Sequence, residues 1–480
     1  MHAADDEGFN PAEPQLGLWD AVSVIIGIVV GAGIYETAPL VFSNAKSPAQ
    51  AMLVWALGGV LSLIGATCYA ELASTYPRSG GDYVYLTRAF VPVVGFLFGW
   101  AELVVLLTGS IAMMAYVFAD YAVALCGLPD HQSFLFAVVA VVSLTLLNLA
   151  GVVVGKSAQN VLSWVKVAGL GMIVVAGLSW GSPRELALRA SSEESSIGVA
   201  LILVLYTYGG WNDAAFIAAE VRDRKRNVPR ALLLATAGVT AIYLLVNAAF
   251  IAALGFAKAR TSSAIAADVL SLPFGSVAGA VMSLLVMISA LSAANALVFT
   301  GSRVYAALGA DYSVLGALGR WHPRLHSPIV ALFAQLAVSL SLIAIVGTGP
   351  GRRIVDVALK PAGLPPVAWA GHGGFDTLLR CTAPVFWLFF SLTGISLIVL
   401  RAKEPNRPRP FRVPLYPILP LIFCGTCVCM LYASVEYAGS LSLVGVIPVA
   451  LGLPLYFASK RKPASRSAPN TPVEMRRHAT

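Results

Sequence analysis

Apolar stretches long enough to cross a lipid bilayer follow one another along almost the whole chain of 480 residues. A membrane-spanning α-helix needs about 20 mostly apolar residues to cross roughly 30 Å of hydrocarbon. Only 12% of the residues are charged, which leaves too little polar surface to cover a water-soluble body. The sequence therefore predicts an all-α integral membrane protein of about twelve spans, at residues 17–43, 48–75, 91–125, 133–153, 157–180, 196–222, 229–256, 274–309, 327–347, 376–401, 413–434 and 440–459.

The distribution of basic residues predicts the orientation of these spans. The formal net charge of +8 would suggest nucleic-acid binding in a soluble protein, but here the basic residues gather in alternate short connections. With the N-terminus inside, 22 of the 32 lysines and arginines face the cytoplasm and nine face outward. We therefore expect a multi-pass protein of the cell membrane with both termini in the cytoplasm, and no nucleic-acid partner.

The same pattern predicts the domain organisation. One transmembrane domain is expected over 17–460, between a polar cytoplasmic extension at 1–16 and a cytoplasmic tail at 461–480. Since five helices per half make the second half inverted relative to the first, repeat one would be 17–180 and repeat two 196–401. The last two helices, 413–459, would follow the repeats.

Glycines interrupt the first and the sixth span, which occupy matching positions in the two halves. Gly31 and Gly33 lie in the first with Pro39 beyond them, and Gly209 and Gly210 lie in the sixth. Interrupted segments at matching places mark the substrate site of inverted-repeat transporters. Free N–H groups at a helix start suit a carboxylate and free carbonyls suit an ammonium, so an α-amino acid fits both. The alternative is that the glycines only permit close helix packing.

Several long segments resemble one transporter family in order along the chain. These are GAGIY at 31–35, CYAELASTYPRSGGDYVYL at 68–86, YTYGGWNDAAFIAAEVRDRKRNVPRAL at 206–232, ALVFTGSRVYAAL at 296–308 and HPRLHSPI at 322–329. They resemble the amino acid–polyamine–organocation superfamily, most closely its L-type amino acid transporter branch, over about 17–460. The resemblance implies the LeuT-type fold of 5+5 inverted repeats, with helices 1 and 6 broken, and alternating access.

The resemblance also implies which groups hold the substrate. Its carboxylate would bind the backbone of Gly31, Ala32 and Gly33. Its amino group would bind the carbonyls of Val29, Tyr206, Thr207 and Gly209. Tyr206 stands where the family has an aromatic gate, Asn212 would add a polar contact and Trp211 is a gating candidate. Taken without the family, Tyr206, Tyr208 and Trp211 are equally suited to packing or to the membrane interface.

Ionisable residues inside the spans are candidates for coupling, because charge is costly in a bilayer. Lys166 stands where many sodium-independent members carry a lysine, and its ammonium could replace a sodium ion and brace the first interruption. Alternatively, it snorkels to water. Glu36 departs from the family pattern and leaves open a choice between neutral and cationic substrates. Glu102 also lies in a span, and Glu71 and Glu220 are expected to pair with arginines.

The sequence thus predicts secondary, sodium-independent amino acid transport by exchange or proton coupling. The alternatives are a cationic amino acid or polyamine transporter, a sodium-coupled solute symporter, a channel and a nutrient sensor that does not transport. No HExxH, GxSxG or Walker A motif indicates an enzyme or ATP coupling. The six cysteines lack zinc spacing, so no metal or cofactor is expected. Expected partners are the amino acid, the lipid bilayer and, as a candidate, protons; a heavy-chain glycoprotein is not predicted.

Overall fold

The computed structural model describes residues 16–31, 33–78, 80–181, 196–262, 264–325, 327–362, 367, 369 and 373–459. These residues form helices and no strand. The predicted extensions at 1–16 and 461–480 fall almost wholly outside them, as do Ala32 and the side chain of Glu36. In the first half the helices are α1 (Leu18–Val29), α2 (Gly33–Ser43), α3 (Pro48–Thr75), α4 (Asp82–Ala89), α5 (Pro92–Ala101), the π-helix η2 (Glu102–Leu106), α6 (Leu107–Cys126), η3 (Asp130–Gln132), α7 (Ser133–Leu149) and α8 (Val152–Trp180).

The second half has the same all-helical character. Its elements are α9 (Ile197–Thr207), the 3-10 helix η5 (Trp211–Glu220), α10 (Arg224–Leu254), α11 (Phe256–Thr261), α12 (Ile265–Phe274), η6 (Gly275–Val277), α13 (Ala278–Asp311), α14 (Ile329–Gly347), α15 (Gly349–Leu359), η7 (Lys360–Ala362), α16 (Gly374–Lys403), α17 (Ile418–Ala438), η8 (Gly439–Leu441), α18 (Ser442–Ala450) and α19 (Gly452–Ala458).

Eight helical runs in the described chain are long and apolar enough to cross a membrane, or nine if the bent pair α1–α2 is one span. The segment predicted at 133–153 is the shorter apolar helix α7, and the one at 196–222 divides into α9 and η5. The last two predicted segments lie in one run, Ile418–Ala458. Large apolar side chains such as Trp164 and Leu53 are 71% and 67% exposed, which suits contact with lipid rather than water. The protein is therefore a multi-pass α-helical membrane protein.

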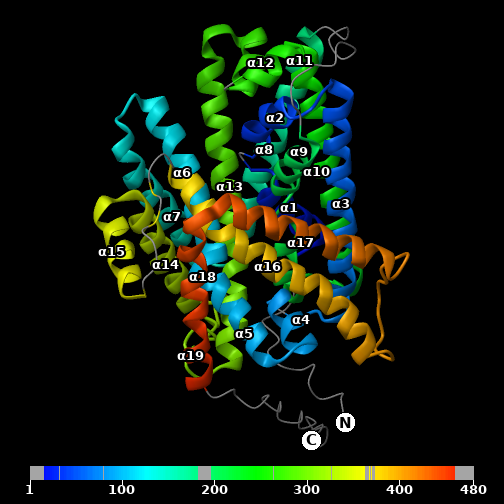
Figure 1. Cartoon of the computed structure of the whole chain (residues 1–480), viewed down its shortest axis with the longest axis vertical. Helices are drawn as coiled ribbons and strands as arrows, with labels where there is room; N and C mark the ends of the chain where they lie inside the picture. Colours follow the sequence, from blue (N-terminus) through cyan, green and yellow to red (C-terminus); the bar gives the residue numbers. More distant parts are fainter. Residues whose placement is uncertain are drawn as a thin grey trace, which may run out of the picture.

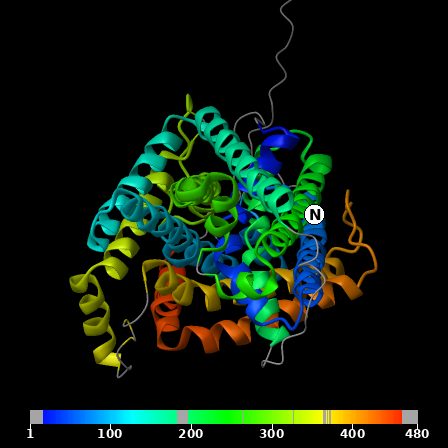
Figure 2. The same cartoon turned by 90° about the horizontal axis from the view of Figure 1, so that it is seen from above.

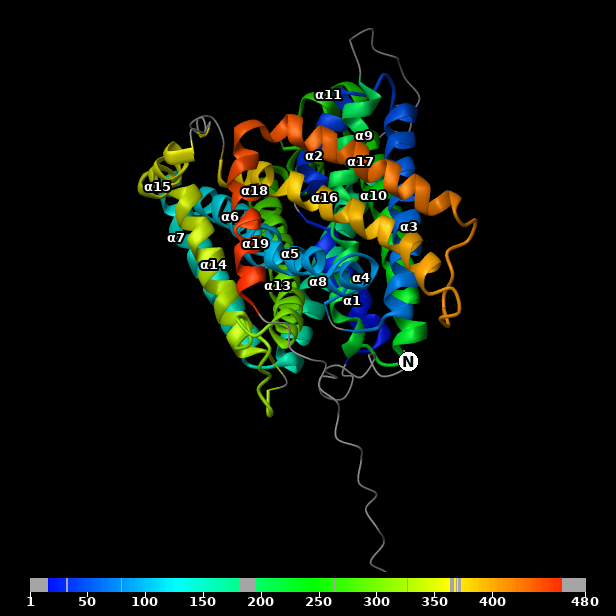
Figure 3. The same cartoon turned by 60° about the horizontal axis from the view of Figure 1, so that its bottom comes forward.

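Helix α13 occupies the middle of the bundle. Seen from above, it is the green helix viewed along its axis, with the teal helix α8 and the cyan helices beside it (Figure 2). It packs against α6, α8 and α1. Helices α7 and α14 lie together on one side of the molecule, and α3 and α10 on the other (Figure 3).

The two ends of the bundle carry different short helices. Helix α4 lies at one end, which we call the α4 end, and α11 and α12 lie at the opposite end (Figure 1). At the α4 end the first residues of the described chain join the end of η5, because Leu16 N–H donates to the Glu220 carbonyl at 3.0 Å and Arg222 N–H donates to the Leu16 carbonyl at 2.8 Å. The residue that precedes the first interrupted segment is thus bound to the end of the second one.

Candidate functional site

The first interruption separates α1 from α2. Helix α1 ends at Val29, α2 begins at Gly33, and the two axes differ by 47°. The Gly31 N–H turns back to the Val29 carbonyl at 2.9 Å. A helix that ends inside a bilayer leaves carbonyls that only protein or ligand can satisfy. Gly31 and Gly33, which the sequence placed in a substrate site, lie at this interruption.

The second interruption follows α9, which ends at Thr207. A turn at 208–210 leads into η5, a 3-10 helix of ten residues, although such helices rarely exceed four. Gly210 has φ of 104°, a region that favours glycine. A Cβ on Gly210 would lie 2.5 Å from Ile28 Cγ2, so the residue also has to be small. The two interruptions therefore pack directly against each other.

Side chains from three helices satisfy the carbonyls at the end of α1. Lys166 Nζ on α8 donates to the Gly27 carbonyl at 2.8 Å. The Tyr243 hydroxyl on α10 donates to the Val29 carbonyl at 2.9 Å, and the Ser289 hydroxyl on α13 donates to the Val30 carbonyl at 3.2 Å. The geometry thus gives the interruption the protein partners that its position among apolar helices requires.

Tyr243 also links the first interruption to the second. Its hydroxyl lies 3.3 Å from the Thr207 carbonyl as well as 2.9 Å from that of Val29, so one proton is shared between two carbonyls. The Thr207 hydroxyl lies 2.8 Å from that of Thr37, which donates to the Gly33 carbonyl at 2.7 Å. Sequence reasoning missed Tyr243 and Thr37. Tyr243 is the one tyrosine in the predicted span 229–256, but nothing in its neighbours distinguishes it from a packing aromatic.

Lys166 lies deep among the helices, 2% exposed, and does not extend to the surface. The Ser163 hydroxyl, on the same helix, donates to the Ser23 carbonyl at 2.9 Å, one turn before the Gly27 carbonyl. The Gln159 amide covers Gly27, where a Cβ would lie only 1.8 Å from Gln159 Nε2. Helix α8 therefore holds α1 in place through polar contacts to the backbone of Ser23 and Gly27.

The other predicted residues of the sixth span, Tyr206, Trp211 and Asn212, lie in different surroundings. Tyr206 is half-buried, and its carbonyl accepts the Gly209 N–H at 3.0 Å. Trp211 is buried and its ring lies 5.2 Å from that of Tyr69, so it packs into an aromatic cluster between helices. The Asn212 amide donates to Asp213 Oδ1 at 2.9 Å. Asn212 Oδ1 is buried and has no hydrogen-bond partner among the described residues.

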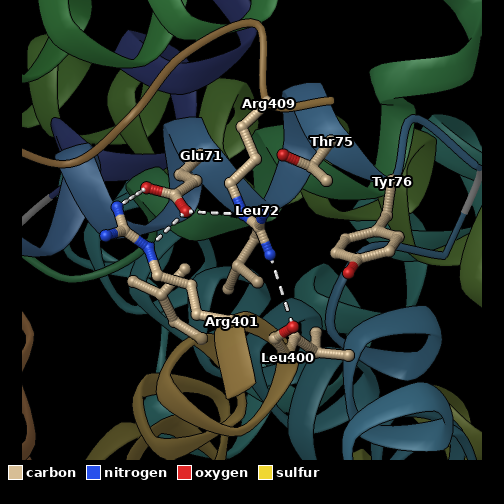
Figure 4. Close-up of a pocket in the computed structure, with 8 residues that line it drawn as sticks. Glu71, Leu72, Thr75, Tyr76, Leu400, Arg401 and Arg409 are labelled. Carbon is tan, nitrogen blue, oxygen red and sulfur yellow. Dashed lines mark hydrogen bonds and ion pairs between the residues drawn. The ribbon is translucent and has the colours of Figure 1, made fainter. Parts of the chain in front are cut away.

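Two buried glutamates pair with arginines, as the sequence predicts. At the α4 end Glu71 accepts from Arg401 at 2.7 Å and lies 3.3 Å from Arg409 (Figure 4). It also accepts the Val413 N–H at 2.6 Å. Glu220 accepts from Arg303 at 2.8 Å in a pair that is almost completely buried. Both pairs join segments more than 80 residues apart in sequence, so they hold the α4 end together.

Two pockets in the described chain lie away from the interruptions. One is the crevice around Glu71, and the other lies between η2, α14, α16 and α18, near Val105 and Cys381. Neither lies between residues 29–33 and 206–210. The carbonyls of Val29 and Thr207 meet at the Tyr243 hydroxyl instead of facing open space.

Apolar helices that enclose two interrupted segments with satisfied backbone groups define a polytopic α-helical membrane protein. A family model described as amino acid permease matches residues 16–451, and the chain belongs to this family. It is therefore a transporter and not an enzyme, and the predicted resemblance is confirmed.

Curated relatives match over most of their lengths. The b(0,+)-type amino acid transporter 1 of Mus musculus is 28% identical over 85% of this chain and 81% of its own. The Large neutral amino acids transporter small subunit 2 of Mus musculus is 28% identical over 95% of this chain and 82% of its own. The Cystine/glutamate transporter of Homo sapiens is 28% identical over 92% of this chain and 84% of its own.

Proposed function

We propose that this protein is a secondary amino acid transporter that works by alternating access and needs no sodium. The observation that carries the proposal is the meeting of two interrupted helices, where the Val29 and Thr207 carbonyls point at one hydroxyl. Relatives named as transporters of neutral amino acids, of cystine and glutamate, and of the b(0,+) type support an amino acid as the substrate.

The substrate would lie between the interruptions as a zwitterion. Its carboxylate would accept the N–H groups of 31–33 at the start of α2, because a helix start carries partial positive charge. Its ammonium would donate to the Val29 and Thr207 carbonyls, with Tyr206 and Gly209 beside them. In the structure Tyr243 donates to these carbonyls, so the ammonium would take over bonds that the phenol makes in its absence.

The lysine at 166 supports sodium independence. Its ammonium already donates to the Gly27 carbonyl, and carbonyl oxygens are the ligands that hard cations such as sodium would need. A fixed positive charge there opposes a bound sodium ion by electrostatic repulsion. Glu36 keeps a cationic amino acid or a polyamine as the alternative substrate.

The architecture we propose is the LeuT-type fold of twelve helices, with inverted repeats at 17–180 and 196–401 and helices 11 and 12 at 413–459. The α4 end would face the cytoplasm with both termini, and the transporter domain at 17–460 would sit in the cell membrane. The excess of basic residues on that side supports this orientation.

Uptake into proteoliposomes tests the proposal. Labelled amino acids should exchange against unlabelled ones in sodium-free buffer, and sodium should not increase the rate. Lys166→Met should abolish uptake because it removes the donor to the Gly27 carbonyl, whereas Lys258→Met, an exposed lysine on α11, should not. Sodium-stimulated uptake would refute sodium independence. Amino acid binding without any flux would identify a sensor instead.

A further inference from the structure

Three buried carboxyls gather beside the second interruption without a cation. Asp82 begins α4, Glu102 begins the π-helical turn η2, and Asp213 lies in η5. They are 2%, 6% and 7% exposed. Each lies within electrostatic range of the other two. A π-turn inside a long helix is frequently a functional feature.

The groups around these carboxyls are polar and uncharged. They are Tyr69 from α3, Tyr85 from α4, Asn212 from η5, Tyr305 from α13 and Thr393 from α16. Among the described residues, no lysine or arginine acts on any of the three carboxyls. Arg303 is buried two residues before Tyr305 on α13, but it is already paired with Glu220.

Several buried polar atoms at this cluster lack hydrogen bonds within the part of the chain that the structure describes. They are one oxygen of Asp82, the amide oxygen of Asn212 and the hydroxyls of Tyr69 and Tyr85. The Tyr69 hydroxyl lies close enough to Asp82 to influence its ionisation, yet forms no hydrogen bond of acceptable geometry with it. Buried polar groups without partners are rare and indicate an additional donor or acceptor.

That additional ligand is a proton rather than a metal ion. In the described chain, no group of three or more histidines, cysteines, aspartates or glutamates has the arrangement to hold a metal. Three ionised carboxylates in one buried region would repel each other, and a proton bound to one of them relieves the repulsion. Burial is the largest influence and raises the pKa of the Asp82 carboxyl well above its usual value; Tyr69 lowers it by a smaller amount, the charge of Asp213 raises it, and Thr393 has the smallest, lowering effect.

The cluster lies at the contact between η5 and the loop before α4. The loop before α4 docks on η5, because Gly80 N–H donates to the Phe216 carbonyl at 3.3 Å. A Cβ on Gly81 would lie 2.6 Å from the Phe216 ring. Asp213 lies on η5, three residues after Gly210, while Asp82 lies on α4. Separation of α4 from η5 therefore moves one carboxyl away from the other and lets water reach both.

We propose that Asp82, Glu102 and Asp213 form the proton-binding site that couples amino acid transport to proton movement. This inference rests on the proposed function. While α4 and η5 are in contact, a carboxylate takes a proton from water on the far side, reached past the second interruption, and an O–H bond forms. When α4 and η5 part, that bond breaks and the proton leaves to water at the α4 end, so one proton accompanies each amino acid.

Proteoliposomes that contain a pH-sensitive dye test this site. Addition of the amino acid should acidify the lumen, and a one-unit inward pH gradient should accumulate substrate about tenfold, since one pH unit on one proton is worth a factor of ten. Asp82→Asn, Glu102→Gln and Asp213→Asn should each abolish lumen acidification and the accumulation, while exchange of labelled for unlabelled amino acid continues. Asp223→Asn, at an exposed carboxyl, should behave as wild type.

The outcomes separate this inference from the proposed function. Amino acid exchange by the wild type without any proton movement would overturn the inference alone, and this measurement needs no variant. Proton coupling that survives all three substitutions would also overturn it. Absence of any amino acid flux would overturn the proposed function and the inference with it. If the asparagine variants fail to fold, Asp82→Glu, which keeps a carboxyl, should retain coupling, and its loss of coupling with intact exchange would contradict the site.

Discussion

Replacement of Tyr243 by phenylalanine tests how the two interruptions hold their ligand. The change removes one hydroxyl and keeps the ring, whose centroid lies 5.7 Å from that of Trp55 and 5.0 Å from that of Tyr208. The Val29 and Thr207 carbonyls then lose the donor that they share at 2.9 and 3.3 Å. A buried group left without a partner costs about 1–3 kcal/mol. Because one proton serves both carbonyls, we expect the free energy of unfolding to fall by an amount near the lower limit of this range.

The effect on ligand binding has the opposite sign to the effect on stability. In the wild type the substrate ammonium has to displace the Tyr243 hydroxyl, whereas in the variant the Thr207 carbonyl has lost this donor and the Val29 carbonyl keeps only the Gly31 N–H. A gain of about 1 kcal/mol in binding corresponds to roughly fivefold tighter affinity. Titration of the purified protein with amino acid, followed by thermal unfolding and by calorimetry, gives both quantities, because a ligand of the folded state raises apparent stability by mass action.

A matched control is Tyr208→Phe, because the Tyr208 hydroxyl donates to the Trp55 carbonyl of α3 at 3.3 Å and not to the Val29 or Thr207 carbonyl. This variant should lose some stability without any change in affinity. Tyr243→Phe with weaker amino acid binding would refute the reasoning, because it would mean that the phenol holds the substrate rather than standing in for it.

Three further predictions concern the parts that surround the site. Gly210→Ala should abolish transport and lower the unfolding temperature, because a left-handed backbone costs an alanine about 1–2 kcal/mol and its Cβ would overlap Ile28; a wild-type unfolding temperature would contradict this. Glu220→Gln should destabilise the protein by about 3–5 kcal/mol, since it leaves Arg303 buried without its partner, and Glu220→Gln with Arg303→Met should recover part of the loss. The free energy of unfolding should fall as the pH rises above about 4, because folded Asp82 keeps its proton where the unfolded chain releases it, and Asp82→Asn should weaken this dependence in thermal scans at several pH values.

The sequence predicted the long elements well, because their signals are local. The apolar segment predicted at 48–75 is helix α3, Pro48–Thr75, which Ser47 caps through the Gln50 N–H. Gly31 lies between α1 and α2 and Gly33 begins α2, at an interruption that fits the lower helix stability of glycine. The sixth predicted span differed more. Its α-helix ends at Thr207 and continues as a 3-10 helix, a change that composition alone does not specify.

The contacts of the candidate site could be predicted only in kind. Burial required that Glu71 find a cation, but the choice of Arg401 depends on packing across 330 residues of sequence. The pairing of Tyr243 with Val29 spans 214 residues, and no local pattern distinguishes that tyrosine from others. Asp82 was overlooked for the same reason. It lies between two predicted spans, at the start of α4, and only the contact of the preceding loop with η5 brings it near Asp213.

The most direct test of a zwitterion held between two helix interruptions is competition by half-substrates. Labelled amino acid exchange in proteoliposomes would be measured against the parent amino acid, the amine without its carboxylate and the acid without its amine. Hydrogen bonds to charged groups are worth about 1.5–3 kcal/mol, so each analogue should compete roughly 10- to 150-fold more weakly than the parent. An analogue that lacks either charged group and competes as well as the amino acid itself would contradict the account.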